Sequence, residues 1–160
     1  MIIIGEKINS SLSPVKAALD AYDKTYIQTL ARKQYEAGAS YIDVNAGTFI
    51  EKEPEMLEWI VNTVQEVLDV PFSLDSPNPR ALERALKANK NSKPIINSLT
   101  GEKERYNAVM PLVVEYNTRI IALCMDDGGM PETAEDRVKI ADSLISRLTQ
   151  KGVPLDDIFI

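Results

Sequence analysis

Short apolar runs alternate with longer amphipathic stretches along the whole chain. Six of these runs are rich in β-branched residues and predict strands at 2–4, 41–44, 71–74, 94–96, 119–123 and 157–160. The runs are mostly continuous, which is typical of strands covered on both faces, and they lie about one βα unit apart. The pattern therefore predicts an α/β protein built around a parallel sheet.

Apolar residues at three- and four-residue steps predict four helices between these strands. The expected buried stripes are Ile27, Leu30, Ala31 and Tyr35; Leu57, Ile60, Val61, Val64, Val67 and Leu68; Leu82, Ala85 and Leu86; and Val138, Ala141, Leu144, Ile145 and Leu148. Residues that favour helix ends accompany them: Gly38, Pro54, Asn78 with Pro79, and Thr133 with Asp136. Pro111 falls inside a fifth amphipathic segment, so we expect a kink or two short helices there.

Composition narrows the class of protein. With 160 residues, 44% of them hydrophobic, and a net charge of −6, the chain is expected to form one globular domain over residues 1–160. Lys and Arg are scattered, which argues against a nucleic-acid partner. The sequence contains no apolar stretch of about 18 residues and no cleavage-type segment after Met1, so we expect no membrane span, no signal peptide and a cytoplasmic location.

The residue types present also limit the chemistry. The chain has no histidine, and Cys124 is its only cysteine, which excludes a Ser-His-Asp triad, a Cys-His pair, a histidine-ligated zinc and an intrachain disulfide. Neither a GxGxxG nor a GxxxxGK[ST] segment is present, which argues against a nucleotide cofactor. Any reaction would have to use carboxylates, amides, lysine or the backbone.

Polar residues follow five of the six predicted strands. They are Glu6, Lys7 and Asn9; Asp43 and Asn45; Asp75 and Ser76; Asn97 and Ser98; and Asp126. Each could be a turn residue, as Asp75 before Ser76 and Pro77 shows. The carboxyl ends of barrel strands meet at one rim, however, and together these side chains would form a pocket for a flat heterocycle such as a pterin. Length alone favours an open doubly wound sheet, because a complete (β/α)8 barrel needs about 250 residues, but the polar strand ends favour the barrel.

Four segments resemble a known family in their order and spacing. IIGEKIN at 3–9, DVNAG at 43–47, LDSPN at 74–78 and INS at 96–98 resemble the pterin-binding methyltransferases, and most closely the methyltetrahydrofolate:corrinoid protein methyltransferases. The resemblance implies a (β/α)8 TIM barrel of the pterin-binding type, of which about the first five and a half βα units are present. Relatives have a pterin-binding Asp one residue beyond the position of Ile160, so we expect a domain that is incomplete at its C-terminus.

The resemblance also implies a reaction and a set of site residues. The enzyme would transfer a methyl group between N5 of methyltetrahydrofolate and the cobalt of a corrinoid (cobalamin) on a partner protein, in a direction that the sequence does not fix. Asp75 would bind the pyrimidine edge and Asn97 would act near N5, as the catalytic residue. Secondary candidates for pterin binding are Asn9, Asp43, Asn45 and Ser98. The enzyme would need no metal of its own, and we expect a homodimer in an anaerobic one-carbon pathway.

Two alternatives remain open at this point. One is a pterin enzyme like dihydropteroate synthase, which belongs to the same superfamily and catalyses a different reaction. The other is a non-catalytic half-barrel that acts through self-association at its open sheet edge.

Overall fold

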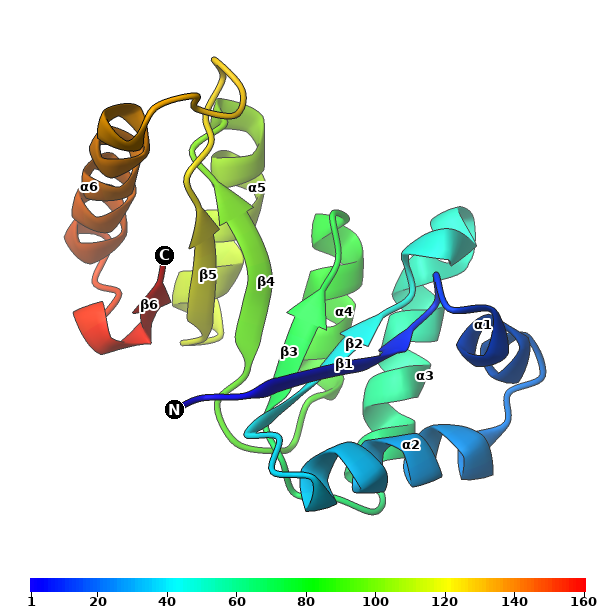
Figure 1. The fold of residues 1–160 in the computed structure, drawn as a ribbon. Helices are drawn as coiled ribbons and strands as arrows, with labels where there is room; N and C mark the ends of the chain where they lie inside the picture. Colours follow the sequence, from blue (N-terminus) through cyan, green and yellow to red (C-terminus); the bar gives the residue numbers. More distant parts are fainter. The chain divides into compact units, whose positions relative to one another are not determined.

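Parallel strands and helices alternate along the chain in the computed structural model, which describes residues 1–160 (Figure 1). The chain divides into two compact units, Met1–Pro94 and Ile95–Ile160. The first contains β1 (Ile4–Asn9), α1 (Ser13–Asp20), α2 (Lys24–Glu36), β2 (Tyr41–Asn45), η1 (Gly47–Lys52), α3 (Glu53–Gln65), β3 (Phe72–Asp75) and α4 (Pro79–Ala88). The second contains β4 (Ile95–Thr100), α5 (Lys103–Glu115), β5 (Arg119–Leu123), α6 (Ala134–Gln150), η2 (Leu155–Asp157) and β6 (Ile158–Phe159). The single-domain interpretation stays a prediction.

The sheet of the first unit has one apolar and one polar face. Its strands β1, β2 and β3 are parallel and lie in sequence order. Ile42, which is fully buried, is in register with Gly5, and a Cβ on Gly5 would lie 2.8 Å from Oε1 of Gln34 on α2, so this face is directed at the helices. The residues that alternate with the helix-facing ones form the opposite face of the sheet and are largely polar. In β2 they include Asp43 and Asn45. Continuous apolar runs therefore describe these strands only in part.

Strand β1 differs most from its predicted position. Prediction placed the strand at 2–4, whereas it begins at Ile4 and continues through the polar residues to Asn9. Its register with β2 is irregular between Gly5 and Ile8, and the two residues within the irregularity, Glu6 and Lys7, are exposed. The backbone N–H of Lys7 donates to Oε1 of the buried Gln34 at 2.7 Å, which satisfies a donor that the irregular pairing leaves available.

In two helices of the first unit, the buried residues differ from the predicted ones. In α2, Ile27 and Ala31 are buried, but Tyr35 is 50% exposed and Gln34 takes the inward position. Helix α3 ends at Gln65, so the expected inward residues Val67 and Leu68 follow the helix. Two elements, α1 and η1, were not predicted. Each is short, and α1 buries only Val15, Ala18 and Leu19, which is too few for a clear helical period. Helix α4 agrees with its prediction, since Asn78 caps it by accepting from the N–H of Arg80.

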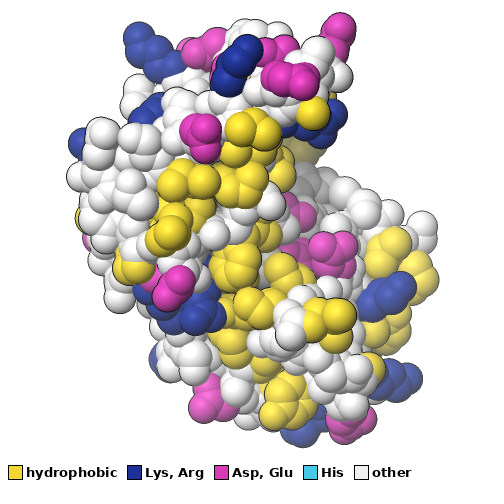
Figure 2. Space-filling model, turned by 60° about the vertical axis from the view of Figure 1, so that its left-hand side comes forward, with side chains coloured by type: hydrophobic (Ala, Val, Ile, Leu, Met, Phe, Trp, Pro, Cys, Tyr) yellow, Lys and Arg dark blue, Asp and Glu magenta, His cyan; other side chains and the backbone are white.

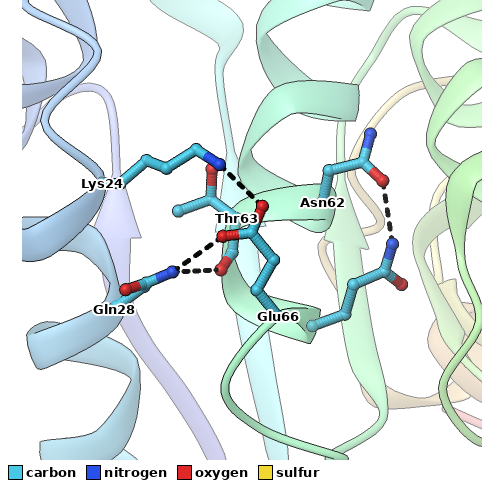
Figure 3. A network of polar contacts seen from close by, with 6 residues as sticks. Lys24, Gln28, Asn62, Thr63 and Glu66 are labelled. Atoms are coloured by element: carbon cyan, nitrogen blue, oxygen red, sulfur yellow. Dashed lines mark hydrogen bonds and ion pairs between the residues drawn. The ribbon is translucent and has the colours of Figure 1, made fainter.

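Helices α2 and α3 are joined on the outer surface by a small polar network (Figure 3). Nζ of Lys24 lies 2.6 Å from Oε1 of Glu66, and Nε2 of Gln28 donates to Oε2 of Glu66 and to the carbonyl oxygen of Thr63, both at 3.1 Å. The charged groups are about half exposed, so the network contributes little stability and mainly fixes how the two helices face each other.

The hydroxyl of Thr63 in this region has no hydrogen-bond partner although it is buried. Thr63→Val has nearly the same shape and removes the unsatisfied group, so we expect the free energy of unfolding to rise by about 1 kcal/mol. Urea denaturation measures the change. Thr29→Val on the exposed side of α2 is the control and should have almost no effect. A clear loss of stability in Thr63→Val would contradict the expectation.

The second unit contains three parallel strands in the order β4, β5, β6. Pro111 lies inside α5, which is a single helix from Lys103 to Glu115. Of the two options predicted here, a kink or two short helices, the second is therefore wrong. Buried residues on both sides of the proline, among them Met110 and Leu112, hold the two parts of α5 in one packed arrangement. This packing offsets the backbone hydrogen bond that proline cannot donate. The peptide bond between Asn97 and Ser98 of β4 is cis.

Helix α6 begins as predicted but is covered less than expected. Thr133 caps it by accepting from the N–H of Asp136 at 3.1 Å, and the hydrogen bond from Lys139, followed by that from Thr133, lowers the pKa of the Asp136 carboxyl. Of the predicted stripe only Leu144 and Leu148 are buried, while Val138 is 59% exposed. Hydrophobic side chains are also visible at the surface in Figure 2. No helix is both long and apolar enough to cross a bilayer.

Candidate functional site

A row of polar side chains crosses the carboxyl ends of the three strands in the first unit. Asn9 of β1 is in register with Asn45 of β2, and Asn45 is in register with Asp75 of β3. All three side chains are half-buried. Because parallel strands present residues in register on the same face, the sequence folds these three predicted site residues into one row.

Asn45 and Asp75 are hydrogen-bonded to each other. Nδ2 of Asn45 donates to Oδ2 of Asp75 at 2.9 Å. Oδ1 of Asn45 accepts from Oγ of Ser10 at 3.2 Å and from the N–H of Gly47 at 3.0 Å. An amide oxygen that accepts two hydrogen bonds fixes which side of the amide faces the carboxylate. The amide thus holds the Asp75 carboxylate as an oriented acceptor.

Asn9 and Asp43 have other local surroundings. Oδ1 of Asn9 accepts from both the N–H (2.9 Å) and the hydroxyl (2.7 Å) of Ser11, so its acceptor atom stabilises the turn after β1. Asp43 lies one row further from the strand ends, is 2% exposed, and accepts from the hydroxyl of Ser73 at 2.6 Å. The Asp43 carboxylate is therefore buried in the interior of the unit, whereas Asp75 lies nearer the surface.

The turn that carries Asp75 is held by a buried carboxylate that the sequence did not single out. Oγ of Ser76 donates to Oε1 of Glu53 at 2.5 Å and accepts from the N–H of Asn78 at 3.0 Å. Both Glu53 and Ser76 are buried. Glu53 is the first residue of α3, where a negative charge is favoured by the helix dipole. A glutamate directly before Pro54, at a predicted helix start, was the signal that could have identified it.

The second unit has its own polar strand end at β4. Asn97 and Ser98 are half-buried, and the carbonyl oxygen of Ser98 accepts from Arg105 of α5, through Nε at 3.1 Å and Nη2 at 2.5 Å. Arg105 was not predicted, because a lone arginine on a helix is usually a solvated surface residue. The register between β4 and β5 is irregular between Asn97 and Leu99, immediately at this position.

The remaining polar strand-end residues have local partners or lie at the surface. In the second unit, Oδ1 of Asp126 accepts from the N–H of Gly128 at 2.8 Å, within the loop after β5. Asp127 accepts from the N–H of Lys103 at 3.1 Å, at the first residue of α5. Glu6 and Lys7 of the first unit are exposed. No group of three or more His, Cys, Asp or Glu side chains is arranged to hold a metal ion.

This geometry fits a heterocycle whose edge carries hydrogen-bond donors. An ionised carboxylate only accepts, and it can accept two parallel hydrogen bonds from an amino-pyrimidinone edge. Asn45, beside Asp75 in the first unit, adds an amide that both donates and accepts. The serine hydroxyls that donate to carboxylates here, those of Ser73 and Ser76, are buried. The more accessible part of the site therefore acts through hydrogen bonding and orientation.

Comparison with known proteins agrees with this description. Residues 6–160 match the family model described as "Pterin binding enzyme". The chain is 38% identical over 148 residues to the methylcorrinoid:tetrahydrofolate methyltransferase of Eubacterium limosum, which covers 91% of this chain and 54% of that protein. It is 27% identical over 155 residues to the methionine synthase of Mycobacterium leprae, which covers 93% of this chain and 13% of that protein.

Solved structures of dihydropteroate synthases share the fold. The enzyme from Vibrio fischeri superposes with a TM-score of 0.71 at 20% sequence identity, over 98% of this chain and 59% of that one. The enzyme from Thermus thermophilus gives a TM-score of 0.66 at 20% identity, over 96% and 55%. The predicted fold, a partial (β/α)8 barrel, is therefore confirmed in preference to an open doubly wound sheet. The chain spans about half the length of the methyltransferase and of the dihydropteroate synthases that it matches. With the family model matched from residue 6 to residue 160, the chain belongs to the pterin binding enzymes.

Proposed function

We propose that this chain is part of an enzyme that transfers a methyl group between N5 of methyltetrahydrofolate and the cobalt of a corrinoid protein. The observation that carries the proposal is the Asp75 carboxylate, oriented by the amide of Asn45 at the end of β3. The 38% identity to a methylcorrinoid:tetrahydrofolate methyltransferase supports the same reaction class. The identity to methionine synthase, which reaches 27%, also favours methyl transfer.

In this proposal, two residues have the main roles. Asp75 accepts hydrogen bonds from the pyrimidine edge of the pterin, which sets the position of the ring. Asn97 donates a hydrogen bond near N5, where the nitrogen must gain positive character because a methyl group on a neutral amine is a poor electrophile. Asn9 and Asn45 add polar groups beside Asp75, and Asp43 lies in the neighbouring row of the same strands. Ser98, next to Asn97, is a further candidate for pterin binding.

The corrinoid belongs to a partner protein and supplies the cobalt that exchanges the methyl group. This division of labour leaves the chain's own residues with binding, orientation and hydrogen bonding to the pterin. We also expect a homodimer, a cytoplasmic location and a place in anaerobic one-carbon metabolism. Mass measurement in solution tests the first of these expectations, and a monomer would contradict it.

The fold alone would equally suit a dihydropteroate synthase. That alternative is favoured only by structural likeness at 20% identity or below, whereas the methyltransferase is supported by sequence identity at nearly twice that level. The two reactions use different second substrates, so they can be separated directly.

We expect the enzyme of which this chain is part to bind methyltetrahydrofolate and, with a reduced corrinoid protein, to promote formation of methylcobalt, which the absorbance change of the corrinoid follows. Calorimetric titration measures binding independently of turnover. The control substrate is 4-aminobenzoate with a dihydropterin pyrophosphate, from which no dihydropteroate should form. Product in the control reaction, or no methyltetrahydrofolate binding, would overturn the proposal.

A further inference from the structure

Ser10 lies next to Asn45, which orients the proposed pterin-binding carboxylate, and it is not among the predicted site residues. It follows β1 directly and its exposure is 0%. Its N–H donates to the carbonyl oxygen of Asn45 at 3.0 Å, which extends the pairing of β1 and β2 by one residue. The side chain is therefore held rigidly beside Asn45.

The Ser10 hydroxyl accepts one hydrogen bond and donates another. Oγ accepts from the N–H of Thr48 at 3.1 Å and donates to Oδ1 of Asn45 at 3.2 Å. Because the hydroxyl has a single proton and Thr48 N–H can only donate, the proton of Ser10 must be directed to Asn45. Asn45 then donates through Nδ2 to Oδ2 of Asp75 at 2.9 Å. The result is a directed chain from Thr48 through Ser10 and Asn45 to Asp75.

We propose that Ser10 is a positioning residue for pterin binding, which acts through the Asn45 amide to orient the Asp75 carboxylate. The inference rests on the proposed function. In this role Ser10 does not contact the pterin itself, but it helps to orient the Asp75 carboxylate that does. Without the Ser10 proton, Oδ1 of Asn45 keeps only the N–H of Gly47, and the amide is held less firmly in the orientation that directs Nδ2 at the carboxylate.

A less firmly held amide makes a weaker hydrogen bond to Asp75. The ionised form of Asp75 then loses part of the stabilisation that the Nδ2 donor provides. The hydrogen bond from Ser10 to Asn45 joins two neutral groups and supports the charge-assisted one from Asn45 to Asp75. Ser10→Ala should therefore weaken methyltetrahydrofolate binding about ten-fold. Its measured Asp75 pKa should also rise relative to the wild type, which a purely structural role would not cause.

The test is a double-substitution cycle measured by calorimetric titration with methyltetrahydrofolate. Ser10→Ala should weaken binding about ten-fold in the wild-type background and should have no further effect in an Asn45→Ala background. Ser10→Cys keeps a weak donor of similar size and should give an intermediate loss, which also protects the test if Ser10→Ala folds poorly. Ser40→Ala, at the other end of the same strands, removes the acceptor of the Ile3 N–H and should leave binding unchanged.

Two outcomes overturn the positioning role: equal binding by Ser10→Ala and the wild type, or a loss of the same size in the Asn45→Ala background. Carboxyl carbon NMR titration of Asp75 in the protein without ligand provides a separate readout. If the wild type binds no methyltetrahydrofolate, the proposed function fails, while an Asp75 pKa that rises in Ser10→Ala still supports the directed chain. An unchanged Asp75 pKa in Ser10→Ala contradicts the chain whether or not the pterin binds.

Discussion

Asp75→Ala is expected to lower the affinity for methyltetrahydrofolate by about a hundred-fold or more. The carboxylate would accept a pair of charge-assisted hydrogen bonds from the pyrimidine edge, each worth roughly 1.5–3 kcal/mol. Their loss also leaves Nδ2 of Asn45 without the acceptor that it has now at 2.9 Å. Calorimetric titration of both proteins at neutral pH measures the difference.

Two further variants separate recognition from folding. Asp75→Asn keeps the shape and one acceptor oxygen, which would face Nδ2 of Asn45. The new NH2 group would then face the donors of the pyrimidine edge, so we expect a loss of binding close to that of Asp75→Ala. Asp20→Ala removes an exposed carboxylate that pairs with Lys16 on α1 and should leave the affinity unchanged. Unchanged affinity in Asp75→Ala would remove the central residue of the proposed site.

Ser76→Ala is expected to destabilise the protein by about 2–4 kcal/mol, since the hydroxyl supplies a short hydrogen bond to the buried Glu53. Removing it leaves a carboxylate in the interior without that donor and also frees the N–H of Asn78. Urea denaturation, with equal slopes for both proteins, gives the difference in the free energy of unfolding. Ser146→Ala on an exposed part of α6 should change stability by less than about 0.5 kcal/mol.

The double variant Glu53→Leu with Ser76→Ala identifies the cause. If the loss comes from a stranded carboxylate, replacing both partners by apolar groups should recover much of the stability, because the cost of an unsatisfied buried group disappears. If the loss in Ser76→Ala comes from the turn alone, the double variant will be no more stable than the single one. The measurement therefore distinguishes a buried polar pair from a turn effect.

Periodicity was enough to predict the βα alternation, and motif order was enough to predict the family. Strand β5 was predicted with its observed bounds, and the cap of α4 by Asn78 was predicted as well. Both depend on strong local preferences, an apolar β-branched run and an Asn-Pro helix start. Strand β1 could not be placed correctly, because half of its residues are polar and its irregular pairing depends on Gln34, which is distant in the sequence.

The residues of the candidate site also differ in whether a local sequence signal identifies them. Asn45 and Asp75 were predicted because they directly follow apolar runs, and strand ends of a parallel sheet meet at one edge. Ser10, Glu53 and Arg105 were missed, since each acts through a partner that only the fold brings near. A buried hydroxyl or carboxylate has no local sequence signal of its own. Its role depends on tertiary contacts, and these become visible only when strands and helices are placed.

The pairing of Asn45 with Asp75 in register also guards against misfolding. Successive strand residues point to opposite faces, so a slip of one residue in β3 would turn Asp75 and Ser73 toward the helices and expose Phe72 and Leu74. That arrangement would place a carboxylate among the apolar side chains of α3 and α4 at a large cost in desolvation. The residue proposed to recognise the ligand is thus also one that penalises the wrong alignment of the strand.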